Sequence, residues 1–481
     1  MLLPFENRPM LGWDSGQSPT SDKSRAHRSN VVVLGAGFGG LWAAKTLAKG
    51  PVNVSLIDRH NYHTFFPLLY QVGAAELDPA DITQPLRKIF WNRTNVRFFL
   101  GDVQEVDLSA KVVRIPGHEI SYDYLVVALG SMPNFYGIPG LAEYAFTLKS
   151  LEQGITLRNQ ILTSFERAAC EVDPERRQAW LTFTIVGGGP TGVEFAGALM
   201  ELIHGSLDRD FPHLDLRQAR VVLLEASDHL LEGMPEKLSA YAQGRLKNMG
   251  IDVRLNSRVV KITPLEVLTR DGTRISSRTV VWTAGVQGNI SARQWGLATN
   301  RHNQVEVLPT LQVPDRPEVY VVGDLAGIQQ DGRPLPMIAQ VGIQTGTAAG
   351  RNILRQSAGK PPQPFRYHEK GTLDVIGRNA AVAYIWRQAF RGFPAWLIWV
   401  WVHIFNLIGY RNRFLVLINW AWDYLFSEHS VRIIVPTEIH TGNSFTTTEI
   451  PDKVGVLVRL PGYSPAASSR SSRVAPLEPP R

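Results

Sequence analysis

The sequence predicts an α/β fold with two similar parallel-sheet units, followed by a helical region. Runs of Val, Ile and Leu alternate with helical stretches over most of the chain, which is the pattern of parallel strands covered by helices. A strand, a glycine-rich turn and a helix follow one another twice, at residues 31–48 and 182–202. Two apolar, aromatic runs at 393–410 and 414–426 predict helices near the C-terminus.

Composition limits the chemistry that the chain can carry. Its 481 residues, 44% of them hydrophobic, suffice for two to four domains with buried cores. Cys170 is the single cysteine. The chain therefore cannot form an internal disulfide, a CxxC redox pair, a four-cysteine zinc site or an iron–sulfur cluster on its own cysteines. Any redox chemistry must come from a bound organic cofactor.

The two ends of the chain differ from its centre. Residues 1–29 are polar, rich in Ser, Pro, Asp and Arg, and lack the continuous apolar segment of a secretory signal. We expect this tail to be disordered. A C-terminal extension, 428–481, becomes similarly polar from about residue 462, and we expect disorder from there.

The two glycine-rich turns have the form of dinucleotide-binding turns. In VVVLGAGFGGLWAAKTLA (31–48) and TFTIVGGGPTGVEFAGALMEL (182–202), glycines follow a strand and open a helix. Glycine permits a tight turn and close approach of the backbone, and the helix N-terminus then faces a pyrophosphate. Because both copies have this context, we predict two dinucleotide sites. Their glycines are Gly35, Gly37, Gly39 and Gly40 in the first turn, and Gly187, Gly188, Gly189 and Gly192 in the second.

Each unit also has an acid at the end of its second strand. Asp58 ends VSLID and Glu225 ends VVLLE, where a carboxylate accepts hydrogen bonds from a ribose diol. Glu225 follows Gly192 by more than the usual spacing of about 20 residues, so the second unit needs a longer helix or an insertion, which 204–217 can supply. No Arg directly follows Glu225, and its charge would repel a 2′-phosphate. These features favour NADH over NADPH.

Three further strands run into small-residue turns. The segments 122–134 and 278–289 suit crossings of the chain between two domains. The third, PEVYVVGDLAG (317–327), ends in Gly323 and Asp324, where an aspartate can hold the ribityl or pyrophosphate part of a flavin.

With these motifs the chain resembles flavoproteins that have two dinucleotide-binding domains. Within that superfamily it resembles the type II, non-proton-pumping NADH dehydrogenases, or NADH:quinone oxidoreductases. Four segments carry the narrower resemblance: HTFFPLLYQVG (63–73), GGGPTGVEFAGAL (187–199), AQVGIQTG (339–346) and EKGTLDVIGRNAAVA (369–383). The resemblance extends from about residue 30 to 427.

The resemblance implies a domain order. An FAD-binding domain would comprise residues 30–150 and 285–350, with an NADH-binding domain, 151–284, inserted into it. Residues 351–427 would form a region that lies near the quinone and anchors the protein to a membrane.

The resemblance also implies site residues. Non-covalent FAD would contact Gly35, Gly37, Phe38, Gly39, Gly40, Asp58, Val103, Ala128, Gly130, Gly323 and Asp324. NADH would contact Gly187, Gly188, Gly189, Thr191, Gly192, Glu225, Ala284 and Gly285, with its nicotinamide near Glu194. The quinone would lie at the flavin beside Gln340 and Gln344 of the AQxxxQ motif, with Lys370 close by. Many relatives have Ala where this chain has Gly342.

Each catalytic candidate has a simpler alternative. Gln340 and Gln344, spaced i and i+4, share one helix face and either reach the quinone or only hydrogen-bond the flavin ring. Glu194 lies just inside a helix and either acts beside the nicotinamide or only complements the helix dipole. Lys370 either stabilises developing negative charge or contacts lipid headgroups.

No metal site is expected. His60 and His63 lack a Glu or Cys at ligand spacing, so we interpret them as packed loop residues. The chain also lacks the acidic pattern of an EF-hand loop.

The C-terminal region predicts membrane attachment. Lys360–Phe426 holds eight Lys or Arg against three Asp or Glu, and these surround aromatic, apolar runs, which favours an anionic lipid surface over nucleic acid. His403 and Asn406 interrupt the first run, and the second is too short to span a bilayer. Two polar stripes, one of His403, Asn406 and Tyr410 and one of Asn419 and Asp423, predict helices lying in the interface. One spanning helix is the alternative.

The function predicted from all this is a membrane-associated FAD enzyme that oxidises NADH and reduces a quinone without pumping protons. The alternative is an NAD(P)H-dependent flavin reductase of a protein electron carrier, of the ferredoxin-reductase type. The expected location is the cytoplasmic face of the cell inner membrane. Expected partners are a membrane quinone and the bilayer surface, but not nucleic acid; the family often forms homodimers.

Overall fold

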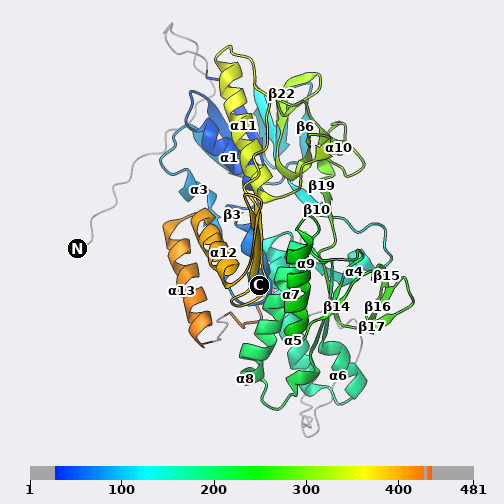
Figure 1. Cartoon of the computed structure of the whole chain (residues 1–481). Helices are drawn as coiled ribbons and strands as arrows, with labels where there is room; N and C mark the ends of the chain where they lie inside the picture. The colour runs from blue at the N-terminus through cyan, green and yellow to red at the C-terminus, as the bar shows by residue number, and fades with distance from the viewer. Residues whose placement is uncertain (1–27, 427–430, 436–481) are drawn as a thin grey trace, which may run out of the picture. The chain divides into compact units, whose positions relative to one another are not determined.

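Two separate sheets, built mainly of parallel strands, organise the chain in a computed structural model that describes residues 28–426 and 431–435 (Figure 1). The predicted N-terminal tail and nearly all of the predicted C-terminal extension lie outside these residues. The α/β class predicted from the alternating pattern is confirmed.

The first sheet is built from two distant parts of the chain. Its centre is β1 (Asn30–Leu34), which pairs in parallel with β2 (Asn53–Asp58) on one side and β9 (Tyr124–Val127) on the other. The edge beyond β9 comes from much later in the sequence. The strand order is β21 (Gln312–Val313), β22 (Arg316–Val321), β9, β1, β2 and β5 (Val96–Leu100). The first sheet is therefore discontinuous in sequence, as predicted for the FAD unit.

The second sheet is inserted between those two parts. Its order is β11 (Ala145–Thr147), β18 (Thr279–Trp282), β12 (Thr182–Val186), β13 (Arg220–Leu224) and β14 (Asp252–Arg254). The chain crosses between the sheets where β10 (Ser131–Pro133) pairs with β19 (Val286–Gly288). Strand β11 pairs with β18, so it joins the second sheet although the predicted boundary at residue 150 assigned it to the first domain.

Helices cover both sheets. In the first unit, α1 (Phe38–Leu47) packs on α11 (Ala339–Ser357); in the second, α7 (Pro190–Leu202) lies near α5 (Leu151–Cys170) and α9 (Glu236–Asn248) (Figure 1).

Shorter elements complete the units. In the first they are β3 (Tyr62–Thr64), α2 (Leu69–Gly73), β4 (Thr83–Pro85), α3 (Leu86–Ile89), β6 (Glu105–Asp107), β7 (Val112–Ile115), β8 (His118–Ser121), α10 (Ser291–Gln294), β20 (Val305–Glu306), β23 (Ala326–Gly327), β24 (Gln329–Gln330) and β25 (Arg333–Pro334). In the second they are α4 (Leu141–Tyr144), α6 (Pro174–Trp180), β15 (Val259–Ile262), β16 (Glu266–Thr269) and β17 (Arg274–Ser276).

The wide spacing between Gly192 and Glu225 has a visible cause. After α7 the helix continues as a π-helical turn, Ile203–Leu207, and then as the short α8 (Asp208–Asp210). This segment delays β13 and lies within the stretch predicted to contain the insertion.

A stripe of glycines lets α11 approach α1. A Cβ added at Gly346 would lie 2.0 Å from the carbonyl oxygen of Gly39, and one added at Gly350 would lie 2.8 Å from Cβ of Thr46. At Gly342 the nearest atom would be 3.2 Å away. The Ala that many relatives have at position 342 would therefore fit after a small adjustment. An Ala at position 346 would not fit.

The C-terminal region is a small antiparallel sheet followed by two helices. The sheet contains β26 (Thr372–Val375), β27 (Ala381–Ile385) and β28 (Gln388–Gly392), and the helices are α12 (Phe393–Asn406) and α13 (Tyr410–Phe426). The two helices lie side by side in Figure 1. No helix among the described residues has both the length and the apolar character required to cross a bilayer.

Helices α12 and α13 expose apolar side chains that an ordinary surface helix would bury. Their outward faces are apolar: Trp401 is 72% exposed, Phe414 64% and Leu425 71%. The predicted polar stripe through His403 was wrong in detail, because that ring is buried and its Nδ1 lies 2.8 Å from the Trp399 carbonyl oxygen.

Polar side chains of α13 instead hold the helix on the body of the protein. The Asn412 amide donates to the carbonyl oxygens of Asp81 and Thr83 at 2.9 and 2.8 Å, and Asn419 donates to the Asp81 carboxylate at 2.8 Å. The indole N–H of Trp420 donates to Gln71 Oε1 at 3.0 Å. These three polar side chains of α13 therefore point inward, and the outward face is largely apolar.

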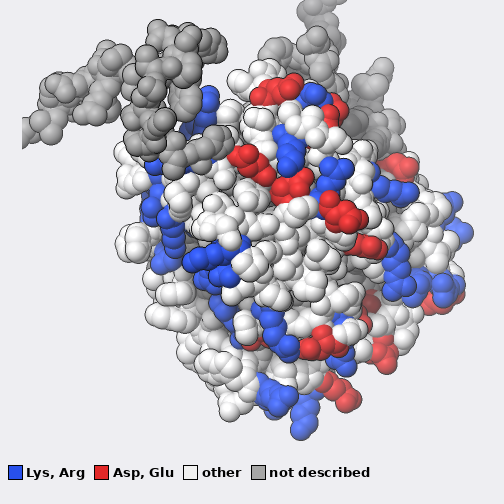
Figure 2. Space-filling model, turned by 90° about the horizontal axis from the view of Figure 1, so that it is seen from above, with Lys and Arg blue, Asp and Glu red and all other residues white. Residues whose placement is uncertain are grey.

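Charge on another face of the molecule is less organised. Figure 2 shows Lys and Arg gathered along one edge of that face and mixed with Asp and Glu elsewhere. The net charge of +7 alone therefore does not mark a binding surface there.

The glycine stripe yields a prediction for stability. Gly346→Ala should lower the free energy of unfolding by about 1–3 kcal/mol, because its Cβ can be accommodated only if α11 moves away from α1. Gly342→Ala is the matched control, since it makes the same chemical change one helical turn earlier. Thermal and urea unfolding should show a clear loss only for Gly346→Ala; equal effects of the two substitutions would contradict the packing described.

Candidate functional site

The two glycine turns repeat the same geometry. Gly35 and Gly187 have φ of +91° and +116°, which favour glycine, and their N–H groups donate to the second strand at 2.8 Å in both units. A Cβ at Gly40 would lie 1.8 Å from the Gly35 carbonyl oxygen, and one at Gly192 would lie 1.9 Å from that of Gly187. Each helix therefore packs directly against the glycine turn that precedes it, as the motif predicted.

The first residues of α1 and α7 leave room for a ligand. Gly37 and Gly189 are the N-caps, both are extended, and no side chain caps either helix. A Cβ at either glycine would have no described atom within 4 Å. Two helix N-termini with free N–H groups and open space beside them fit the pyrophosphates of two dinucleotides.

The predicted ribose acids also organise the turns. Asp58 Oδ2 accepts the N–H of Ala36 at 2.6 Å, and Glu225 Oε2 accepts the N–H of Gly188 at 2.6 Å. Burial raises the pKa of Asp58, although the N–H groups of His60 and Ala36 oppose that change. Each acid therefore fixes the middle residue of its glycine turn.

A polar cluster surrounds Asp324. This residue lies in the 3₁₀ turn Gly323–Leu325, and Ser131 Oγ donates to its carboxylate at 2.5 Å. Burial lowers the pKa of Lys149, and the nearby charge of Asp324 acts in the opposite direction. Sequence reasoning found Asp324 but missed Ser131 and Lys149, which no motif marked.

His63 belongs to the first turn rather than to a metal site. It is 2% exposed, its Nδ1 lies 2.8 Å from the Ala36 carbonyl oxygen, and its ring meets Phe38 edge-on. Burial lowers its pKa to about 4, so the ring is neutral. No group of three metal-ligating side chains occurs within residues 28–426 and 431–435.

The remaining residues predicted to contact FAD or NADH lie where the chain crosses between the two sheets and near the ends of helices and strands. The backbones of Ala128 and Ala284 lie directly against Gly35 and Gly187, the positive-φ glycines of the two turns. Thr191 is exposed in the first turn of α7. Gly130 is open, whereas a Cβ at Gly285 would collide with the Tyr136 hydroxyl. Val103 packs partly buried after β5.

The two glutamines of α11 have different surroundings. The Gln344 amide pairs with the backbone of His368, donating to its carbonyl oxygen at 2.9 Å and accepting its N–H at 3.0 Å. Gln340 Oε1 is buried and has no hydrogen-bond partner among the described residues. Gln344 therefore fixes the segment that leads to the exposed Lys370, while Gln340 retains an unused acceptor.

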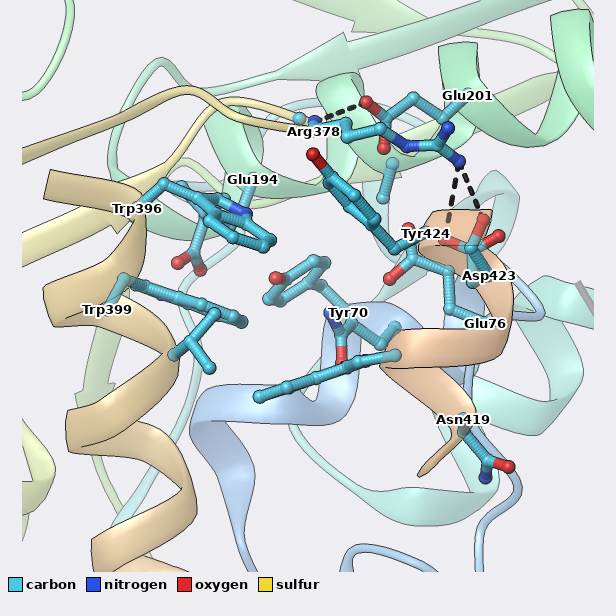
Figure 3. Close-up of a pocket in the computed structure, with 16 residues that line it drawn as sticks. Tyr70, Glu76, Glu194, Glu201, Arg378, Trp396, Trp399, Asn419, Asp423 and Tyr424 are labelled. Carbon is cyan, nitrogen blue, oxygen red and sulfur yellow. Dashed lines mark hydrogen bonds and ion pairs between the residues drawn. The ribbon is translucent and has the colours of Figure 1, made fainter. Parts of the chain in front are cut away.

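Glu194 lines a pocket between α7, α2 and the C-terminal helices (Figure 3). The pocket is open to solvent, and its cavity volume is about 60 Å³. Aromatic side chains form much of its wall: Tyr70, Trp396, Trp399, Trp420 and Tyr424. The Tyr70 hydroxyl is buried and finds no hydrogen-bond partner in the described part of the chain.

Burial keeps the Glu194 carboxyl neutral. The side chain is 8% exposed, and burial, assisted by the negative charge of Asp374, raises its pKa well above the usual range. The backbone N–H of Val375 and the indole of Trp399 act in the opposite direction. A protonated acid therefore faces an aromatic pocket.

The far rim of the pocket carries charge. The guanidinium of Arg378 donates to the Asp423 carbonyl oxygen at 2.9 Å and lies 3.9 Å from its carboxylate, while the Arg378 N–H donates to Glu201 (Figure 3). These contacts tie α13 to α7 across the pocket.

Several residues that line the pocket or lie next to its lining were not predicted individually. Tyr70, Asp374 and Arg378 lie inside two of the segments that carried the family resemblance, but nothing in their spacing indicated a shared cavity. Trp399 was interpreted only as part of a membrane-facing run. Contacts between elements distant in sequence, not local pattern, bring these four together.

Comparison with known proteins agrees with the motifs. The pyridine nucleotide-disulphide oxidoreductase family matches residues 29–346. A type II NADH:quinone oxidoreductase of Mycobacterium tuberculosis is 39% identical over 424 residues, covering 85% of this chain and 90% of that protein. The enzyme of the same name from Haemophilus influenzae is 32% identical, covering 73% and 86%.

A solved structure supports the fold. NDH2 from Plasmodium falciparum in complex with NADH superposes with a TM-score of 0.77 at 18% identity, covering 85% of this chain and all of that one. At this identity the likeness concerns the fold alone. On the motifs, the family match and the relatives together, the chain belongs to the pyridine nucleotide-disulphide oxidoreductase family and, within it, to the type II NADH:quinone oxidoreductases.

Proposed function

We propose that this FAD enzyme oxidises NADH at the second glycine turn and reduces a quinone that enters through the pocket lined by Glu194. The main observation behind this proposal is the buried carboxyl of Glu194, whose raised pKa favours the neutral form. It lies in an aromatic cavity whose wall includes helices α12 and α13. FAD supplies the two-electron acceptor and donor that the side chains of this chain lack.

The first unit supplies the FAD site in this proposal. The N-terminus of α1 at Gly37 would face the pyrophosphate, and Asp58 a ribose. Asp324, with Ser131 and Lys149, would hold the polar part of the flavin. The partly buried ammonium of Lys149 would favour negative charge on the reduced cofactor.

The second unit supplies the NADH site. Gly189 opens α7 towards the pyrophosphate, and Glu225 is held beside the turn by the Gly188 N–H. Its carboxylate suits the ribose diol of NADH and disfavours the extra phosphate of NADPH.

The pocket supports an acceptor-side role for Glu194. The overall reaction, NADH + H⁺ + quinone → NAD⁺ + quinol, requires one proton beyond the transferred hydride, and a neutral acid can donate it. Gln340 adds an unused amide near the start of α11. Gln344 acts by holding the 368–370 segment, which leaves Lys370 exposed beside it.

The exposed apolar face of α12 and α13 supports docking on a bilayer. Aromatic side chains such as Trp401 and Phe405 gain free energy in the interfacial region, and basic residues such as Arg391 and Arg411 can meet anionic headgroups. We propose an interfacial attachment on the cytoplasmic side of the cell inner membrane, where the pocket would meet quinone from the bilayer.

The central experiment separates the two half-reactions. Anaerobic NADH should bleach the flavin absorbance of the purified holoenzyme, and a quinone should then restore it. Bleaching without recovery, together with recovery on addition of a protein electron carrier, would instead support the ferredoxin-reductase alternative.

A crossed pair of variants tests the two dinucleotide sites. Gly37→Val and Gly189→Val place a side chain in space that is empty of protein atoms, at backbone angles that valine adopts. We expect Gly37→Val to purify with little FAD, and Gly189→Val to retain FAD while its KM for NADH rises at least about tenfold, roughly 1.4 kcal/mol. Flavin content and steady-state kinetics distinguish them. Loss of FAD from both variants would show that the sites are not separate.

Membrane docking has its own test. Combined Trp401→Gln, Phe405→Gln and Phe414→Gln should reduce binding to anionic vesicles at least tenfold, because each exposed ring loses about 1–2 kcal/mol of burial. Turnover with long-tailed quinones should fall more than turnover with a soluble short-chain quinone.

The matched control changes exposed apolar residues elsewhere. Val172→Gln with Leu265→Gln alters side chains that are 86% and 48% exposed near α6 and β16. Vesicle sedimentation should be normal for this double variant. Equal loss of binding in both sets would point to a general change of surface polarity instead of a docking face.

A further inference from the structure

A second buried acid lies behind Glu194. Asp374 is 3% exposed and lies on β26, which packs against the α7 helix that carries Glu194. Val375, the next residue of β26, lines the pocket beside Glu194. The Val375 N–H and the negative charge of Asp374 both act on the Glu194 carboxyl, so the two buried acids lie near one another on neighbouring elements.

Asp374 lacks the partners that a buried carboxylate requires. Its Oδ2 has no hydrogen bond, and no ion pair involves it, among the described residues. Burial alone raises its pKa to about 7. An isolated buried carboxylate is costly, so this group avoids carrying a full charge in the folded protein.

The surrounding charges do not neutralise the pair. The acid groups that face the pocket come from α7, the loop after α2 and α13. Those groups are Glu76, Glu201 and Asp423, together with the phenols of Tyr70 and Tyr424. The guanidinium of Arg378 already lies against Asp423, and the backbone N–H of Arg378 donates to Glu201. Additional negative charge at the pair is therefore opposed from every side.

We propose that Asp374 is a positioning residue that shares one proton with Glu194 and so keeps a neutral carboxyl facing the pocket. When two acids interact in this way, ionisation of one holds the proton on the other. The inference rests on the proposed role of the pocket as the quinone site.

The proton balance follows from the overall reaction. The hydride of NADH carries two electrons and one proton equivalent to the quinone. The second proton leaves the Glu194 O–H as a quinol O–H forms, and the pair then regains a proton from water at the pocket mouth. Asp374 does not touch the quinone, but it limits the pH at which Glu194 can donate.

The test is the pH profile of flavin reoxidation by a short-chain quinone in pre-reduced holoenzyme. Wild-type reoxidation should slow at high pH, where the pair loses its shared proton. In Asp374→Asn the repulsion is removed, so the decrease in reoxidation rate should begin at least about one pH unit lower. At a fixed pH above that point, the variant should reoxidise about tenfold more slowly than wild type. Reduction of FAD by NADH should be unchanged.

A matched variant separates pairing from general charge removal. Glu76→Gln removes a carboxylate that lines the pocket and also acts on Glu194. Because its charge acts on Glu194 less strongly than that of Asp374, its pH profile of reoxidation should shift less than that of Asp374→Asn. Equal displacement by the two variants would overturn the specific pairing.

Glu194→Gln distinguishes the two levels of the proposal. If it leaves both the rate and the pH profile of reoxidation unchanged, the pocket is not the quinone site. If it abolishes the high-pH fall while Asp374→Asn leaves the fall in place, the site stands and proton sharing is wrong.

Stability provides a readout independent of turnover. Folded Asp374 retains a proton that the unfolded chain releases between about pH 4 and pH 7, so wild-type stability decreases as pH rises through this window. Asp374→Asn removes that decrease. The melting temperature of the variant minus that of wild type should therefore increase from pH 4 to pH 7; a constant difference would show that Asp374 is already charged in the folded protein.

Discussion

The contact between each glycine turn and the helix that follows it is the constraint on which the rest of the structure depends. With Gly40 against Gly35 and Gly192 against Gly187, the helices leave no space for a side chain and begin at the carboxyl edge of their strands. In the second unit this fixes α7 so that its first turn opens towards the proposed NADH site and Glu194, shortly after, faces the C-terminal pocket. One helix thus connects the donor side with the acceptor side.

The side chains that attach α13 to the body of the protein also determine which face of the helix points outward. Asn412, Asn419 and Trp420 direct their polar groups towards the body, so hydrogen bonds hold α13 together with the apolar packing of Val416. An ordinary surface helix would hide its rings and expose its amides. Reversing that arrangement leaves the rings available to lipid and places the pocket mouth beside them.

The sequence was sufficient where function depends on local pattern. The two turns, Asp58 and Glu225 follow from glycine spacing and strand order, because these features are formed within short segments. The discontinuous first sheet was expected from the family resemblance. The unequal roles of Gln340 and Gln344 could not be predicted, since their spacing is symmetrical and only the approach of His368 distinguishes them. The same holds for His403, whose place in a polar stripe gave no sign that Trp399 would cover it.

Glu194 shows most clearly how packing decides chemistry. Its position after the glycine turn, considered alone, suggests a charge that complements the helix dipole, and in water it would be ionised. Burial by α12 and the neighbouring strand β26 reverses that protonation state. Because α12 also carries the outward-facing rings, any rearrangement of this helix at a bilayer would alter the burial of Glu194 at the same time. In the proposed mechanism, access of the acceptor and protonation of the donor therefore depend on one packing contact.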